Sequence, residues 1–214
     1  MDLREVFLSH AAKYPAAQPE DMLKLCYQGE FGAGHLLRDT AAARQYLMEE
    51  YAAASEPGVL LEDVGGAFRL HLGAARRAGL SEDALWALFS AARPRGCEAG
   101  LLARMDILRG LAAAEELPFT AEALRAAEAR WQAADYPPMR HSAAFRTEYR
   151  PAYRVIDAEE ARLVPLLCRI AADKPRVIAV DGRCGSGKTT VSRRLSEIFH
   201  APVGHLDDFF LLPA

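Results

Sequence analysis

The segment Gly182-Arg-Cys-Gly-Ser-Gly-Lys188-Thr189 constrains the fold of this chain more than any other stretch. It fits the pattern G-x-x-x-x-G-K-[ST], in which glycines let backbone N–H groups turn inward around a phosphate. A helix that follows such a loop directs its unpaired N–H groups and its positive dipole end at the anion. The pattern predicts a nucleotide phosphate site made of Gly182, Arg183, Cys184, Gly185, Ser186, Gly187, Lys188, Thr189 and Thr190.

Two side chains of this loop carry the expected chemistry. Lys188 would reach the β- and γ-phosphates as a mobile positive charge, and Thr189 would supply a hydroxyl ligand to Mg²⁺. The expected cofactors are therefore ATP and Mg²⁺.

The neighbouring sequence favours the same interpretation. Residues 176–181 form a short apolar, β-branched run between Pro175 and Gly182, which is typical of a buried parallel strand. Residues 189–200 follow as an amphipathic helix, and residues 202–206 are a possible second strand. Strand, loop, helix and strand together predict one βαβ unit.

Two carboxylates, Asp207 and Asp208, stand at the end of that second strand. Ligands of parallel sheets bind in the crevice at the carboxyl ends of the strands. One of the two could accept a proton from a substrate hydroxyl or order Mg²⁺ through water. A solvated turn is the alternative for this pair.

The stretches IAVDGRCGSGKTTVSRRLSEIF and VGHLDDFFLLP resemble the uridine kinase-like branch of the P-loop nucleoside kinases. The resemblance implies a doubly wound parallel sheet and transfer of the ATP γ-phosphate to a nucleoside 5′-hydroxyl. It implies a catalytic role for Asp207 beside Lys188, with Phe209 and Phe210 flanking the acceptor, and we assign Asp208 with Thr189 to the metal. Pantothenate kinase and phosphoribulokinase are related alternatives with similar local sequence.

The resemblance covers only about residues 175–213 of the 214 residues. A complete kinase of this type needs more strands and a lid with arginines, so we expect a C-terminally truncated version of a longer protein or a degenerate remnant. We expect this chain to fold but not to catalyse phosphoryl transfer, because catalysis needs an acceptor held in line and charge stabilisation from beyond the loop.

The preceding part of the chain has helical character. The predicted fold class is mainly α: a helical domain over residues 1–171, then a partial P-loop domain over residues 172–214. No convincing strand is predicted before residue 175. Expected helical stretches are 20–28, 38–51, 62–78, one capped by Ser81, 98–116, one capped by Thr120, and 163–170 preceded by capping-box spacing between Asp157 and Glu160.

This helical region contains a second candidate site. Glu30 and His35 lie in a glycine-rich segment, and Arg146, Arg150 and Tyr153 lie in a segment dense in arginine and tyrosine. Arginine beside tyrosine suits phosphate and base recognition. The alternative is a structural histidine and arginines on a solvated face. The rival function is accordingly a helical nucleotide- or RNA-binding or regulatory module that carries a P-loop fragment.

Composition limits the class of protein. The net charge of −3 argues against a dedicated nucleic-acid binder, which is usually basic. The resemblance implies a small-molecule phosphoryl acceptor, a nucleoside, as partner. The sequence contains no run of ~18 apolar residues, so no membrane span is predicted. The N-terminus lacks the features of a secretory signal, and the four dispersed cysteines form no CxxC pair, so a reduced cytoplasmic setting is expected.

Overall fold

The computed structural model describes residues 2–56, 58–93 and 95–205. Its helices are α1 (Leu3–Lys13), α2 (Pro19–Phe31), a 3₁₀ turn η1 (Gly34–Leu37), α3 (Thr40–Ala53), α4 (Leu72–Arg77), α5 (Glu82–Ser90), α6 (Glu98–Ala113), α7 (Ala121–Ala133), α8 (Ala143–Tyr149), α9 (Ala158–Asp173) and α10 (Lys188–Phe199). Its strands are β1 (Leu61–Asp63), β2 (Ala67–His71) and β3 (Tyr153–Asp157). The prediction of a mainly helical chain is confirmed.

Local sequence explains many helix starts. The side chains of Ser81 and Thr120 accept hydrogen bonds from the backbone N–H groups of Ala84 and Ala123, as N-caps do. Asp157 stands at the N-cap position of α9 but makes no side-chain capping bond. Its Oδ1 lies 3.6 Å from Nε of Arg95 instead, so a tertiary contact replaces the expected capping box.

Residues 62–78 do not form the expected helix, and the expectation of no strand before residue 175 is wrong. The segment folds into β1, a turn, β2 and the short α4. Gly65 and Gly66 adopt φ of +77° and +106°, a backbone conformation that interrupts a helix and allows a tight hairpin turn. Leu61 pairs with Leu70 across this hairpin. The apolar spacing that suggested a helix therefore belongs largely to strands.

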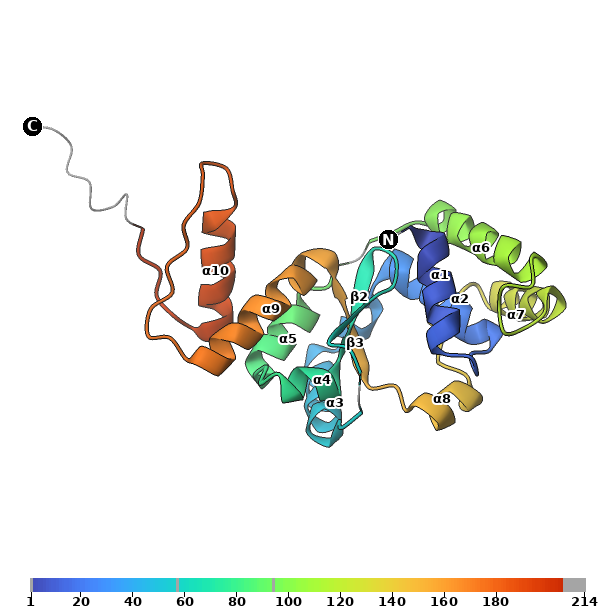
Figure 1. Ribbon diagram of the computed structural model, residues 1–214, viewed down its shortest axis with the longest axis horizontal. Coiled ribbons are helices and arrows are strands. Elements are labelled where there is room, and N and C mark those ends of the chain that lie inside the picture. Colours follow the sequence, from blue (N-terminus) through green and yellow to red (C-terminus); the bar gives the residue numbers. More distant parts are fainter. Residues whose placement is uncertain (1, 57, 94, 206–214) are drawn as a thin grey trace, which may run out of the picture.

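The strands form an antiparallel sheet in the order β1-β2-β3. Helices α5 and α9 pack on one side of this sheet. Helix α2 packs against β2 from the other side, α1 lies beside β1, and α6 and α7 pack against α2. Figure 1 shows β2 and β3 in the middle of the molecule between these two helical layers. One continuous apolar core joins both layers, including Leu23, Leu25, Leu70, Leu85 and Leu88.

The predicted βαβ unit is not formed in the part of the chain that the structure describes. Residues 176–181 lie between α9 and the glycine-rich loop, and residues 202–205 follow α10. Neither segment has strand pairing. Val177 is 84% exposed, so this run is not a buried strand. A β-strand is stabilised by hydrogen bonds with a neighbouring strand, and no strand of the described residues pairs with this run. Residue 206 lies outside the described residues.

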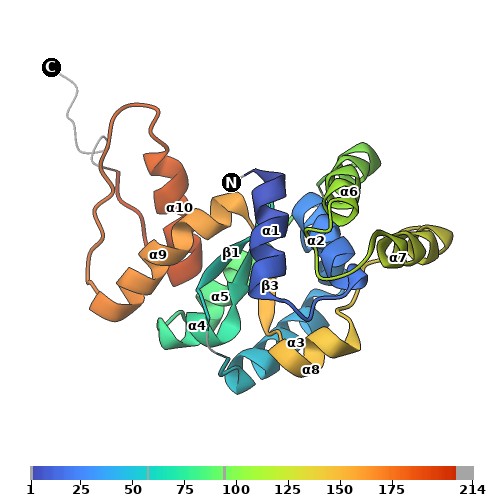
Figure 2. The same cartoon turned by 45° about the vertical axis from the view of Figure 1, so that its right-hand side comes forward.

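Helix α10 forms as predicted and lies beside α9 and α5, at the end of the molecule opposite α6 and α7 (Figure 2). Leu195 and Ile198 are buried in this contact. Nη2 of Arg194 donates to Oε2 of Glu160 at 2.8 Å and to the carbonyl of Ala87 at 2.6 Å. The amphipathic pattern of α10 is therefore satisfied by helices and not by a sheet.

Candidate functional site

The glycine-rich loop leads directly into α10. Gly187 is the N-cap residue with φ of +87°, and Gly185 has φ of +74°. These left-handed conformations suit glycine, because it has no side chain to clash with the backbone. The helix begins at Lys188, so its first N–H groups have no intrahelical acceptor and are directed at the loop. Residues 182–187, Thr189 and Thr190 are exposed.

Lys188 folds back over this loop. Its Nζ donates hydrogen bonds to the carbonyl oxygens of Gly182 at 2.6 Å and Arg183 at 2.9 Å. No carboxylate of the described residues forms an ion pair with it. An ammonium group held by carbonyl oxygens alone, at a helix N-terminus, is chemically suited to an anion. The residues present therefore fit a phosphate group.

The other residues predicted for this site lie elsewhere or beyond description. Asp207 and Asp208, with Phe209 and Phe210, lie outside the described residues. Within the described part of the chain, no group of three or more His, Cys, Asp or Glu side chains is arranged to hold a metal ion. Of the two metal ligands that we assign, Thr189 and Asp208, the structure gives the position of Thr189.

A second and chemically richer region lies between the sheet and helices α1 and α8. It contains an open cavity of about 760 Å³ whose polar lining includes Lys13, Arg69, His71, Glu148 and Arg150. A smaller cavity of about 220 Å³ adjoins it between α1 and β1. Lys13 lines both cavities.

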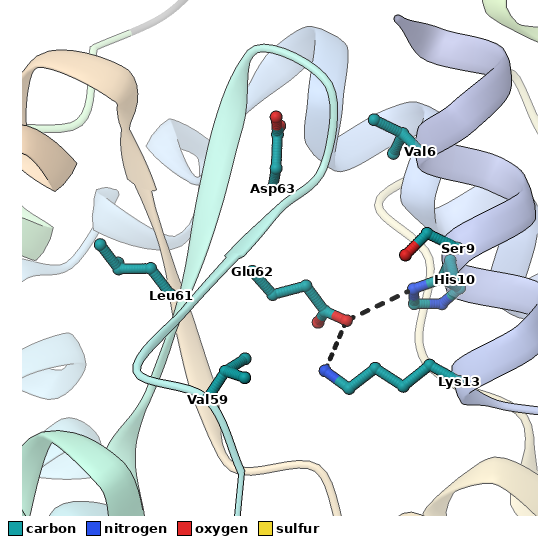
Figure 3. Close-up of a pocket in the computed structure, with 8 residues that line it drawn as sticks. All are labelled: Val6, Ser9, His10, Lys13, Val59, Leu61, Glu62 and Asp63. Carbon is teal, nitrogen blue, oxygen red and sulfur yellow. Dashed lines mark hydrogen bonds and ion pairs between the residues drawn. The ribbon is translucent and has the colours of Figure 1, made fainter. Parts of the chain in front are cut away.

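Glu62 of β1 is the centre of the smaller cavity (Figure 3). Its carboxylate points toward α1, where Nζ of Lys13 lies at 2.8 Å and Nδ1 of His10 at 3.8 Å. Nε2 of His71 lies at 3.3 Å and Nη1 of Arg69 at 3.4 Å from its other oxygen. Burial alone would raise the pKa of Glu62, but the interactions with His10 and His71 and the charge of Arg69 hold it well below its usual range. Glu62 is therefore ionised at neutral pH.

Arg69 of β2 joins this group to the interior. Its side chain is fully buried, and Nε and Nη2 donate to Oε1 of Gln28 at 3.0 and 2.8 Å. Its guanidinium lies over the ring of Tyr153, 4.6 Å from the centroid. The guanidinium is thus fixed from three sides, by Gln28, Glu62 and Tyr153.

A further hydrogen-bonded chain lies behind Tyr153. Its Oη lies 2.6 Å from Nε2 of His141, whose Nδ1 lies 2.8 Å from Oδ1 of Asp21. Burial lowers the pKa of His141 to about 4 despite the hydrogen bond with Asp21. The imidazole is neutral at pH 7, so it donates to Asp21 through Nδ1 and accepts from Tyr153 through Nε2. Oδ2 of Asp21 also accepts from the Ser142 hydroxyl at 2.7 Å, which ties α2 to the start of α8.

The structure brings only part of the residues predicted for a second site together. Arg150 and Tyr153 line the larger cavity, whereas Glu30, His35 and Arg146 do not. Glu30 accepts from Nε of Arg104 at 2.8 Å and from the N–H of Cys97, so it anchors α6. His35 is partly buried against the Tyr27 ring, and burial lowers its pKa. Arg146 is exposed on α8.

Sequence reasoning missed most of the lining residues, above all Arg69 and His71. The stretch Phe-Arg-Leu-His alternates between apolar and polar side chains, which is typical of a strand. The prediction of a helix over residues 62–78 assigned this stretch to the wrong kind of element. Once this segment is a strand, its odd-numbered residues share one face, and Arg69 and His71 both line the cavity.

Comparison of the chain with models of protein families, with curated proteins and with solved structures found no match. Every helix in the described ranges is too short or too polar to cross a membrane. The loop and the cavity are therefore the two features of the described chain that indicate a function.

Proposed function

We propose that residues 182–190 bind the phosphates of a nucleoside triphosphate and that the protein is an ATP-dependent phosphotransferase. The observation that carries this proposal is the position of Lys188, whose ammonium lies over the loop carbonyls at the N-terminus of α10 and pairs with no carboxylate of the described residues. The loop sequence and the two left-handed glycines are consistent with it.

Each residue would have a distinct role. Lys188 and the loop N–H groups would hold the triphosphate, and Thr189 with Asp208 would hold Mg²⁺. Bound ATP would supply the phosphoryl group. Asp207 would accept the proton of the attacking hydroxyl, which the sequence resemblance assigns to a nucleoside or a related small alcohol.

The first test is ATP binding by the purified chain, measured by isothermal titration in the presence of Mg²⁺. We expect Lys188→Ala to weaken binding at least about 10-fold, because a charged hydrogen bond to phosphate contributes roughly 1.5–3 kcal/mol. Arg193→Ala is the matched control, because Arg193 is exposed on the same helix and its loss removes the same charge. Equal ATP affinity of the Lys188→Ala variant would contradict the proposal.

ADP release separates a kinase from a binding module. A phosphotransferase releases ADP faster when an acceptor such as uridine or pantothenate is added, and Asp207→Asn should slow this reaction about 10²-fold. A helical nucleotide-binding module with the same loop would bind ATP without acceptor-dependent release. ATP binding without any such release, in a protein that contains this whole chain, would favour the module.

A further inference from the structure

The larger cavity is bordered by a group of buried charged side chains. Arg69 is completely buried, and the side chain of Glu62 is 10% exposed. Burying such charges is expensive, and a buried ion pair is often no more stabilising than well-packed apolar residues of the same volume. Buried ionisable groups that surround a cavity are instead typical of functional sites.

The charges that line this cavity are balanced. The cationic side chains are Lys13, Arg69 and Arg150, and the anionic ones are Glu50, Glu56 and Glu148. A polyanion such as a nucleoside triphosphate needs an excess of positive charge in its site. An overall neutral ligand that carries both signs of charge matches this lining better.

Most of the lining charges already have partners. Lys13 pairs with Glu62, Glu50 pairs with Arg154, and Oε1 of Glu56 accepts from the N–H of Gly73. Within the described residues, Glu148 and Arg150 have no side-chain partner. They stand two positions apart at the end of α8, a spacing at which helical side chains do not face one another.

Helix α8 also contributes to an aromatic cluster in the wall of the same cavity. The rings of Tyr14, Phe145 and Tyr149 contact one another with centroids 4.8–5.0 Å apart, and all three line the cavity. Oη of Tyr149 accepts from the N–H of Ala16 at 2.8 Å, which fixes the helix against the segment after α1. Phe145 is 1% and Tyr14 8% exposed, so these rings form a rigid core cluster behind the cavity wall, and Tyr149 is the partly exposed ring of the three.

We propose that this cavity is a binding site for a small zwitterion of the amino acid or dipeptide class. Arg150 would pair with the ligand carboxylate, Glu148 would pair with its ammonium group, and the partly exposed Tyr149 ring would contact an apolar side chain. The buried group of Glu62, His71 and Arg69 would hold the base of the site in place. This site is distinct from the loop at residues 182–190, because α5, α9 and the sheet lie between α8, whose residues line the cavity, and α10 (Figure 1).

Isothermal titration of the full chain with L-phenylalanine and with alanyl-phenylalanine tests this site. At least one of the two probes should bind, and Arg150→Gln and Glu148→Gln should each weaken its affinity at least about 10-fold. N-acetyl-phenylalanine amide, which lacks both charges, should not bind. Both substituted residues are exposed, so these variants should retain the fold.

Two control variants identify the site. Arg146→Gln removes a charge from the same helix outside the cavity and should leave probe affinity unchanged. Lys188→Ala should also leave it unchanged, so that failure of the loop proposal and failure of this one are distinguishable. The inference is overturned if neither probe binds at millimolar concentration. It is equally overturned if binding is insensitive to Arg150→Gln and Glu148→Gln, or if uridine or inorganic phosphate binds in the cavity and the probes do not.

Discussion

At the scale of single residues, Arg69 is the side chain whose loss we expect to destabilise the buried polar group most. Its buried guanidinium contacts Gln28, Glu62 and the Tyr153 ring, which come from three different elements. Removing one member of such a group leaves the others buried without partners, and that loss is larger than the net contribution of the intact pair.

We therefore expect Arg69→Met to lower the free energy of unfolding by about 3–5 kcal/mol. The measurement is urea denaturation at pH 7. Arg125→Met is the control, because Arg125 forms an exposed pair with Glu122 on α7 and should change stability by less than about 1 kcal/mol. Similar small effects of the two substitutions would show that the buried guanidinium is dispensable.

At the scale of elements, α10 is the helix whose position the sequence did not indicate. It packs on α5 and α9 through Leu195 and Ile198, and Arg194 fastens it to Glu160 and to the end of α5. The extended segments on both sides of α10 have no strand partners in the described chain. Its attachment thus depends on one small apolar contact and one arginine.

Replacing Arg194 with alanine should loosen this helix locally. Amide hydrogen exchange in α10 should become at least about 10-fold faster, while exchange in α1, α2 and the sheet stays the same, because charged hydrogen bonds contribute roughly 1.5–3 kcal/mol. Mass-spectrometric exchange of the peptides covering residues 188–199 measures this. The adjacent, exposed Arg193→Ala provides the comparison. Protection unchanged by Arg194→Ala would mean that the apolar contact alone holds α10.

At the scale of the whole molecule, two buried histidines link stability to pH. Burial lowers the pKa of His10 to about 4, and of His141 to about 4, from the ordinary value of 6.5. The unfolded chain therefore binds more protons than the native one between these values. The contribution of these two histidines to stability is fully present above pH 6.5 and is lost as the pH falls toward 4. Below that range, protonation of Glu62, whose pKa is also depressed, removes more.

The free energy of unfolding should accordingly fall by several kcal/mol between pH 7 and pH 4.5. Each histidine contributes about 1.4 kcal/mol for every pH unit between its unfolded and its native pKa. Urea denaturation across this range measures the slope. His141→Gln should reduce the slope, because glutamine takes up no proton in the unfolded state. A slope that His141→Gln leaves unchanged would assign the pH dependence to other groups.

The sequence by itself determined the features that depend on neighbours a few residues apart. Ser81 and Thr120 cap their helices through bonds to residues three positions later, and the glycines before Lys188 place a loop at the start of α10. The tertiary structure decided the sheet, because Phe68 finds its partner in Ile156, which no local pattern specifies. It also decided the cavity, which Arg69 of β2 and Arg150 after α8 line together only once the sheet has formed. Helix caps are satisfied within one turn, whereas strand pairing and a charged cavity depend on which distant segments the apolar core brings together.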